Sequence, residues 1–279
     1  METNRPPVAI VTSGGGMKCA YSGGALVALA KELNITQPDI FVAASGSVAS
    51  MFYFLAGQYD DIERAWTQFL PSNLFIRYAP LPAMRINYLI DTIFKTYIPL
   101  EVTRFEHTST QFFVPLTDLD TGETRFVTND QWFSPYEIMR AAKAIPILYN
   151  HPVQLGGETY VDGDISTGMM SLIQKAIDSG ARRILCITNT EEQRTLAKII
   201  VWMYTRTLSK ALREVVLRDM QDHKPIVWPD GTEFVCLSPS YPLPNALFTR
   251  NRRTTVESFR MGYDDLMAKQ EEIKKLFGV

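Results

Sequence analysis

The sequence predicts an α/β fold in which helices cover a mainly parallel sheet, and two observations lead to this prediction. Within the first 60 residues, a strand, a turn and a helix occur twice in succession. Such alternation is typical of parallel sheets whose strands are joined by helical crossovers. The turn sequence Asp-Thr-Gly-Glu at 120–123 separates two later strand candidates and adds an antiparallel part to the sheet.

The N-terminal elements follow from short apolar runs and the breaks between them. A strand is expected at 8–12, where Val-Ala-Ile-Val-Thr is followed by a serine and three glycines. Apolar residues at helical spacing then predict a helix over 17–33. A second strand at 39–43 runs into Ser-Gly-Ser, and residues 48–56 are expected to form a buried helix.

Further elements are predicted from the same patterns along the rest of the chain. Strands are expected at 111–117, 124–128, 183–188 and 233–237. Helices are expected at 134–143, 168–180, 195–221 and 254–277. The sequence shows no repeat, low-complexity tract or composition break, so residues 1–279 are expected to form a single domain.

Residues 69–100 differ in texture from the rest of the chain, because prolines alternate there with Phe and Tyr. This mixture suits an irregular cap or lid over a pocket. It also suits a satellite core, since burial is the commonest fate of aromatic side chains. The sequence leaves both interpretations open.

The composition excludes several classes of protein. With 46% hydrophobic and 21% charged residues, the chain has the composition of an ordinary folded protein. A net charge of −2 argues against a nucleic-acid partner, which calls for a basic face. Three cysteines, an odd number, favour reduced thiols and a cytoplasmic location. No spacing of His, Cys or carboxylate residues resembles a metal site, and we expect neither a metal nor a cofactor.

Two segments bear on membrane contact. Residues 40–59 carry no charge and are long enough to span a bilayer, but the Ser-Gly-Ser turn divides them into a strand and a helix of a soluble domain. Residues 194–218 read as a basic amphipathic helix. Such a helix can lie on a lipid surface as a peripheral contact or pack its apolar side on the sheet.

Ser45 lies where a nucleophile elbow places its serine, between a strand and the helix that follows. This turn exposes the hydroxyl and directs the N-terminus of the helix at the substrate. In the usual pattern, Gly-x-Ser-x-Gly, glycines flank the serine, whereas Ala43 and Ser47 occupy those positions here. The same run of small residues also suits simple close packing of the strand on the helix.

A glycine run, Gly14, Gly15 and Gly16, follows the first strand and is succeeded by Met17 and Lys18. Successive amides in such a loop can point into one anion-binding site. Neither the Walker spacing nor the dinucleotide fingerprint is met. The oxyanion of an acyl-transfer reaction is therefore the better candidate ligand.

Asp162 and Gly163 end a β-like run. This pattern suits either a solvated hairpin turn or a turn that carries a catalytic aspartate. Together with Ser45 and the glycine run, Asp162 completes the minimum set for acyl transfer: a nucleophile, a base and an oxyanion hole.

These motifs, in this order, resemble those of the patatin-like phospholipases. The resemblance implies a three-layer α/β/α sandwich and a catalytic dyad of Ser45 and Asp162. It also implies that Gly14, Gly15 and Gly16 form the oxyanion hole of a lipid acyl hydrolase, a phospholipase A or lysophospholipase type of serine esterase. Its substrate is a lipid or a small acyl ester, cleaved through an acyl-enzyme. Further matching segments are 117–123, 141–146 and 262–263.

Departures from the family pattern keep an alternative open. Ala43 and Ser47 replace the elbow glycines, and Asp164 replaces a common second glycine after Asp162. Asp164 could repel Asp162 and raise its pKa, or point into solvent. A catalytically weak or inactive relative that binds lipid or a protein partner is therefore the alternative function.

Histidine offers a rival chemistry, because Ser45, Asp162 and His223 follow the chain order of an α/β-hydrolase triad. His223 also stands at the end of a charged helix, where it suits a C-terminal cap.

Overall fold

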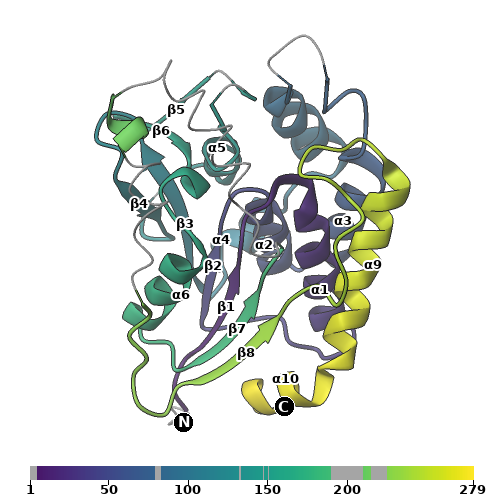
Figure 1. The fold of residues 1–279 in the computed structure, drawn as a ribbon, viewed down its shortest axis with the longest axis vertical. Helices are drawn as coiled ribbons and strands as arrows, with labels where there is room; N and C mark the ends of the chain where they lie inside the picture. Colours follow the sequence, from purple (N-terminus) through teal and green to yellow (C-terminus); the bar gives the residue numbers. More distant parts are fainter. Residues whose placement is uncertain are drawn as a thin grey trace.

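A central sheet runs through the molecule (Figure 1). The computed structural model describes residues 5–78, 83–131, 133–146, 148–149, 151–189, 210–214 and 225–279. Within these residues the sheet has eight strands: β1 (Val8–Thr12), β2 (Ile40–Ala43), β3 (Gln111–Asp118), β4 (Thr124–Val127), β5 (Val153–Leu155), β6 (Glu158–Asp162), β7 (Arg183–Ile187) and β8 (Glu233–Leu237).

The strand order is β5-β6-β3-β2-β1-β7-β8, with β4 also paired to β3. All neighbours from β3 to β8 run parallel, whereas β4 and β6 pair antiparallel with β3, and β5 pairs antiparallel with β6. The predicted sheet, mainly parallel with an antiparallel part around 120–123, is therefore confirmed.

Helices connect most of these strands. The α-helices are α1 (Ala20–Lys31), α2 (Ser47–Leu55), α3 (Tyr59–Arg64), α4 (Val102–Glu106), α5 (Pro135–Ala141), α6 (Met169–Asp178), α9 (Arg252–Ala268) and α10 (Gln270–Phe277). Two 3-10 helices, Gly16–Cys19 and Gly163–Ile165, follow β1 and β6, and two π-helical segments cover Ala65–Phe69 and Tyr88–Tyr97.

Helices cover both faces of the sheet. Alternate side chains of a strand point to opposite faces, so neighbouring strand residues belong to different apolar clusters. Ile10 and Phe41 belong to the larger apolar cluster, which includes residues of α1 and α2. Ala9 and Val42 belong to a second cluster, which includes Leu172 of α6. The expected three-layer α/β/α sandwich is confirmed (Figure 1).

Helix α9 packs closely against α1, the helix that follows the glycine run. A Cβ at Gly24 would lie 1.8 Å from the carbonyl oxygen of Phe259, and a Cβ at Gly262 would lie 1.9 Å from that of Tyr21. These two glycines let the backbones approach to a distance that no larger residue allows. The crossing therefore holds α1, and the loop that precedes it, in a fixed place.

The C-terminal helix expected over 254–277 differs from the prediction, because it is broken at Lys269 into α9 and α10. Helix α9 lies on α1, whereas α10 lies at the β7 and β8 end of the sheet. The break lets the chain change direction between these two packing partners. The helix expected at 195–221, the basic segment 194–218 and His223 lie largely or wholly outside the described residues.

Residues 69–100 combine buried and exposed aromatic side chains, and the part from Tyr88 to Tyr97 is helical. Phe75 and Phe94 are buried, whereas Tyr78 and Tyr97 are 60% and 49% exposed. The buried aromatics pack into the larger apolar cluster of the protein rather than into a satellite core of their own.

The uncharged stretch 40–59 is divided into β2, a turn and α2 and the start of α3, as predicted. No helix in the described ranges is both long and apolar enough to cross a bilayer.

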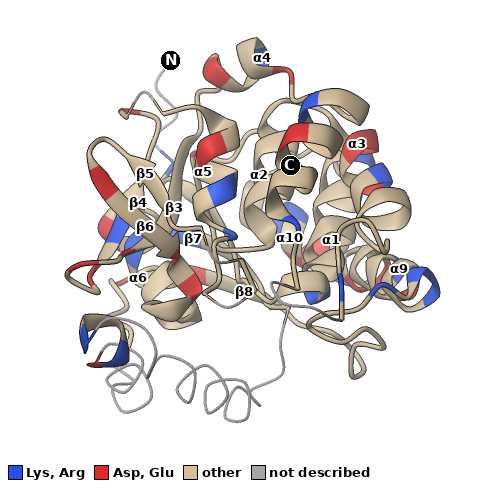
Figure 2. Ribbon diagram, turned by 90° about the horizontal axis from the view of Figure 1, so that it is seen from above, with Lys and Arg blue, Asp and Glu red and all other residues tan. Residues whose placement is uncertain are grey.

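The three cysteines are free, and Cys186 and Cys236 are neighbours on β7 and β8 with their sulfur atoms 4.0 Å apart. Basic and acidic side chains lie close together on the outer helices, including α3 (Figure 2).

Candidate active site

Ser45 occupies a strained turn between β2 and α2. Its φ is +48°, a conformation that is uncommon for residues other than glycine. The turn is closed by hydrogen bonds from the amide of Ser47 to the carbonyl of Ala44, at 3.1 Å, and from Val48 to Ser45, at 3.2 Å. Such strain costs about 1–3 kcal/mol and persists where the surrounding structure enforces it, often at functional sites. The predicted elbow is present in this geometry.

Gly46 brings the elbow against the glycine run. A Cβ at Gly46 would lie 2.7 Å from the carbonyl oxygen of Gly16 and 2.8 Å from the sulfur of Cys19. These distances are shorter than van der Waals contact, so a larger residue would separate Ser45 from the loop. The glycine that this turn requires is therefore at position 46, directly after the serine.

Ser47 sits in a buried polar network and does not disturb the packing of α2 on the strands. Its hydroxyl donates to the carbonyl of Ser13 at 2.7 Å and lies 3.0 Å from the hydroxyl of Ser22. The side-chain amide of Asn189 donates to both Ser47, at 3.2 Å, and the Ser13 carbonyl, at 2.7 Å. Ser47, which replaces an elbow glycine, thus links α2 to the end of β1 and to the chain after β7.

Asp162 ends β6 and meets Ser45 across the sheet. The Ser45 hydroxyl Oγ donates to Asp162 Oδ2 at 2.7 Å, and the amide of Asp164 donates to Asp162 Oδ1 at 2.9 Å. A Cβ at Gly163 would lie 2.1 Å from the carbonyl oxygen of Pro115 on β3. Glycine at this position therefore allows the strand end to fold over β3, which brings the carboxylate to the serine.

Burial raises the pKa of Asp162 to about 8, because the side chain is shielded from water and its charged form loses hydration. This value includes the effect of the negative charge of Asp164, which also raises the pKa, and those of hydrogen bonds from Asp164 and Ser45 and of the charge of Lys143, which lower it. Asp164 therefore lies where its charge repels that of Asp162, rather than pointing into solvent.

The glycine run lies beside the elbow. Gly16 has a φ of +55°, in the left-handed region that favours glycine. The amide of Met17 donates to the carbonyl of Leu247 at 2.9 Å. The amides of Gly14, Gly15 and Gly16 have no acceptor among the residues that the structure describes. Of the three glycines, Gly16 lines the cavity beside Ser45, whereas Gly14 and Gly15 are buried next to it in the chain.

The side chain of Asp164 lies directly on Gly14. A Cβ at Gly14 would be only 1.7 Å from Asp164 Oδ2. A carboxylate so close to the loop adds negative potential beside its amides, in addition to its effect on Asp162. Asp164 is thus placed to influence both candidate parts of the site.

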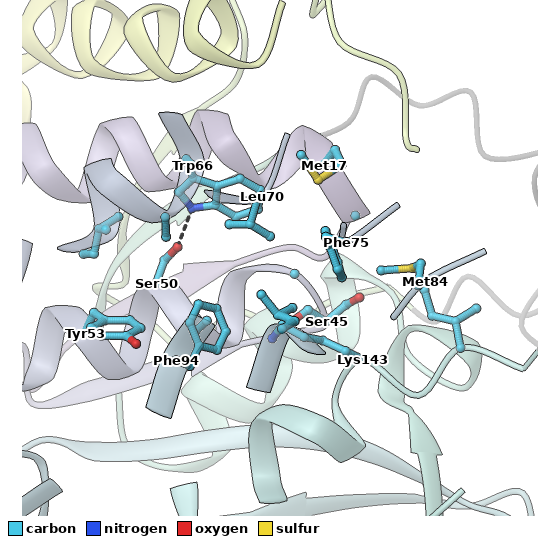
Figure 3. Close-up of a pocket in the computed structure, with 17 residues that line it drawn as sticks. Met17, Ser45, Ser50, Tyr53, Trp66, Leu70, Phe75, Met84, Phe94 and Lys143 are labelled. Carbon is cyan, nitrogen blue, oxygen red and sulfur yellow. Dashed lines mark hydrogen bonds between the residues drawn. The ribbon is translucent and has the colours of Figure 1, made fainter. Parts of the chain in front are cut away.

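A narrow cavity of about 30 Å³ lies beside Ser45 (Figure 3). A water molecule needs roughly 10–15 Å³ by this measure, so the cavity holds two or three. Much of its wall comes from the segment 66–94, in particular Trp66, Leu70, Phe75, Met84, Leu89 and Phe94. The wall is therefore mostly apolar, and the predicted cap segment takes part in it.

Two polar side chains in the wall, Trp66 and Tyr53, are engaged in hydrogen bonds within the protein. The indole Nε1 of Trp66 donates to Ser50 Oγ at 2.9 Å, and the hydroxyl of Tyr53 donates to the carbonyl of Ile98 at 2.5 Å. Lys143 is the charged residue that lines the cavity with Ser45 (Figure 3). Sequence reasoning noted Lys143 only as part of the segment 141–146, because no local pattern marks one lysine after a helix as buried.

The described histidines, His107 and His151, are exposed and do not line the cavity. The described residues contain no cluster of three or more His, Cys, Asp or Glu side chains that could hold a metal ion.

The sequence model of the patatin-like phospholipase family matches residues 10–170, more than half of the chain. The chain belongs to the patatin-like phospholipase family. This membership places it among lipid hydrolases, and the matched region contains Ser45, Asp162 and the glycine run. No curated protein sequence matches the chain.

The chain is similar to solved structures of low sequence identity. VipD from Legionella pneumophila is 14% identical, with a TM-score of 0.50, and the match covers 96% of this chain and 67% of VipD. Human GIVD cytosolic phospholipase A2, in complex with methyl gamma-linolenyl fluorophosphonate, is 12% identical with a TM-score of 0.48. That match covers 97% of this chain and 59% of the human protein, so the chain spans less than two thirds of its length.

Proposed function

We propose that this protein hydrolyses acyl esters of lipids, with Ser45 as the nucleophile and Asp162 as its base. One observation supports this more than any other. The hydroxyl of Ser45, held in a strained turn beside an apolar cavity, donates to the buried carboxylate of Asp162 at 2.7 Å. A nucleophile within hydrogen-bond distance of a base is the arrangement that covalent acyl transfer requires.

In the proposed reaction, Asp162 accepts the proton of Ser45 Oγ as the oxygen attacks the ester carbonyl. The amides of Gly14, Gly15 and Gly16 stabilise the negative charge that develops on the carbonyl oxygen. The alcohol or lysolipid leaves with a proton from Asp162, and the acyl group stays on Ser45. Asp162 then removes a proton from water, which attacks the acyl-enzyme and releases the fatty acid.

The environment of Asp162 suits it to this role. An aspartate with an ordinary pKa near 4 is a weak base towards a hydroxyl group. With a pKa of about 8, the ionised form of Asp162 is a stronger base. The cost is that only a fraction of the carboxyl groups is ionised at neutral pH, so the rate depends steeply on pH.

The wall of the cavity favours an acyl chain as the group that enters it, because hydrocarbon groups gain free energy when they leave water. Its small volume favours short acyl chains, or longer ones that displace the side chains of segment 66–94. Leu74 and Tyr78 of the same part of the chain are 55% and 60% exposed. We place peripheral contact with lipid aggregates there.

The test is hydrolysis by purified protein of short-chain p-nitrophenyl esters and of phospholipid vesicles. Ser45→Ala and Asp162→Asn should each reduce product release to background, with circular dichroism to show that both variants fold. Full activity in either folded variant would refute the dyad. A folded wild type that releases no product from any ester would instead favour a non-catalytic lipid-binding or protein-binding relative.

His223→Ala separates a dyad from a triad. The dyad predicts that the rate stays near that of the wild type, since Asp162 takes the proton of Ser45 directly. A triad predicts a loss of several orders of magnitude. His151→Ala, at an exposed histidine away from the cavity, is the matched control.

A further inference from the structure

Lys143 is a buried lysine that the proposed reaction does not use. It is 5% exposed and follows the end of α5 in a tight turn, where its amide donates to the carbonyl of Arg140 at 3.2 Å. Burying an ammonium group is costly unless an opposite charge or hydrogen bonds compensate for the lost hydration. The surroundings of Lys143 should therefore contain that compensation.

Two contacts connect Lys143 and its neighbour Ala144 with the two candidate catalytic residues, which are also hydrogen-bonded to each other. Lys143 Nζ donates to the backbone carbonyl of Ser45 at 3.3 Å. The amide of Asp162 donates to the carbonyl of Ala144 at 3.1 Å, and the Ser45 hydroxyl donates to Asp162. Hydrogen bonds thus join three segments around Ser45: the elbow, the end of β6 and the turn after α5.

We propose that Lys143 is a positioning residue of this site, whose ammonium group holds the strained carbonyl of Ser45 and supplies the counter-charge for the carboxylate of Asp162. This inference rests on the proposed function, in which Asp162 must be ionised to act. Lys143 makes no bond to the substrate in this role. It acts through Asp162 and Ser45.

The charged groups around Asp162 explain why a counter-charge is needed. Asp164, from the 3-10 helix after β6, faces Asp162 with a like charge, and the Cys19 thiol lies near both Asp162 and Lys143. Burial raises the pKa of Cys19 to about 12, so this thiol stays neutral. Lys143 is the cation whose charge lowers the pKa of Asp162. Without Lys143, the charge that offsets the effect of Asp164 on Asp162 would be lost.

The charge of Lys143 is present where the reaction needs it. Burial lowers its pKa to about 8, while the negative charge of Asp162 opposes that effect. Below pH 8 the ammonium form therefore predominates. Replacing it with a neutral side chain should raise the pKa of Asp162, because an opposite charge nearby favours the ionised carboxylate.

The experiment is the pH dependence of kcat/KM between pH 5 and pH 10 for the wild type, Lys143→Met and Lys143→Arg, so that both the limb and the plateau above it are measured. Lys143→Met should move the acidic limb upward by about one pH unit or more, which is about a tenfold loss at pH 6. Lys143→Arg keeps the charge and should leave the limb near that of the wild type. Lys274→Met, on the surface of α10, is the matched control and should change nothing.

The proposal would be overturned if the acidic limb of the kcat/KM profile lay at the same pH in Lys143→Met as in the wild type. An equal loss of kcat/KM at every pH in both Lys143 variants would also overturn it. Titration of the Asp162 carboxyl carbon by NMR, assigned with Asp162→Asn, gives a second readout that needs no activity. If no ester is hydrolysed, the proposed function fails, but a higher pKa of Asp162 in folded Lys143→Met still supports the role of Lys143. An unchanged pKa would refute it.

Discussion

The rate of ester hydrolysis should rise steeply as the pH increases from 5 to 7, because Asp162 acts only when ionised. Its buried side chain has a pKa of about 8. Well below that value, the ionised fraction changes about tenfold for each pH unit, from about one in a hundred at pH 6 to about one in ten at pH 7. We therefore expect kcat/KM to increase about a hundredfold between pH 5 and pH 7.

The assay is release of p-nitrophenol from a short-chain ester, read at a wavelength where its two ionisation states absorb equally. Ser45→Ala supplies the background of uncatalysed hydrolysis at each pH. An aspartate that stays exposed would titrate near pH 4 and give a flat profile across this range. A flat profile in the wild type would therefore refute the reasoning that burial sets the basicity of Asp162.

Three further substitutions test the surroundings of the dyad. Asp164→Asn removes the like charge that raises the pKa of Asp162, so the acidic limb should move to lower pH; an unmoved limb would contradict this effect. Ser47→Ala removes a hydroxyl that three buried partners share, and urea unfolding should show a loss of about 1–3 kcal/mol; unchanged stability would mean that the network contributes nothing. Gly46→Ala places a methyl group 2.7 Å from the Gly16 carbonyl oxygen. Esterase activity should therefore fall at least about tenfold while the fold survives. Wild-type activity in this variant would show that the elbow can relax.

Local patterns were sufficient to predict the alternation of strands and helices. The apolar run at Val8–Thr12 and the run that ends at Ala43 are each followed by small residues, and the chain turns there as expected. The strand order could not be predicted in this way. It depends on pairings such as β3 with β6, whose residues are far apart in the sequence.

The same distinction holds within the site. Ser45, Asp162 and the glycine run were found because each lies in a short motif. The sequence shows that Ser47 replaces an elbow glycine, but not that its hydroxyl is accommodated by Asn189, 142 positions away. Likewise, no local pattern brings Asp164 onto Gly14 or buries Lys143 beside Ser45. These contacts arise only when the sheet is assembled.

The most direct test of the account is covalent labelling of Ser45 by a fluorophosphonate, located by peptide mass spectrometry at pH 8. We predict that the wild type is labelled at Ser45 and that folded Asp162→Asn reacts at least about a hundredfold more slowly, because the base that activates the hydroxyl is lost. A folded wild type that remains unlabelled, or an Asp162→Asn variant labelled at the wild-type rate, would contradict the claim that Asp162 activates Ser45.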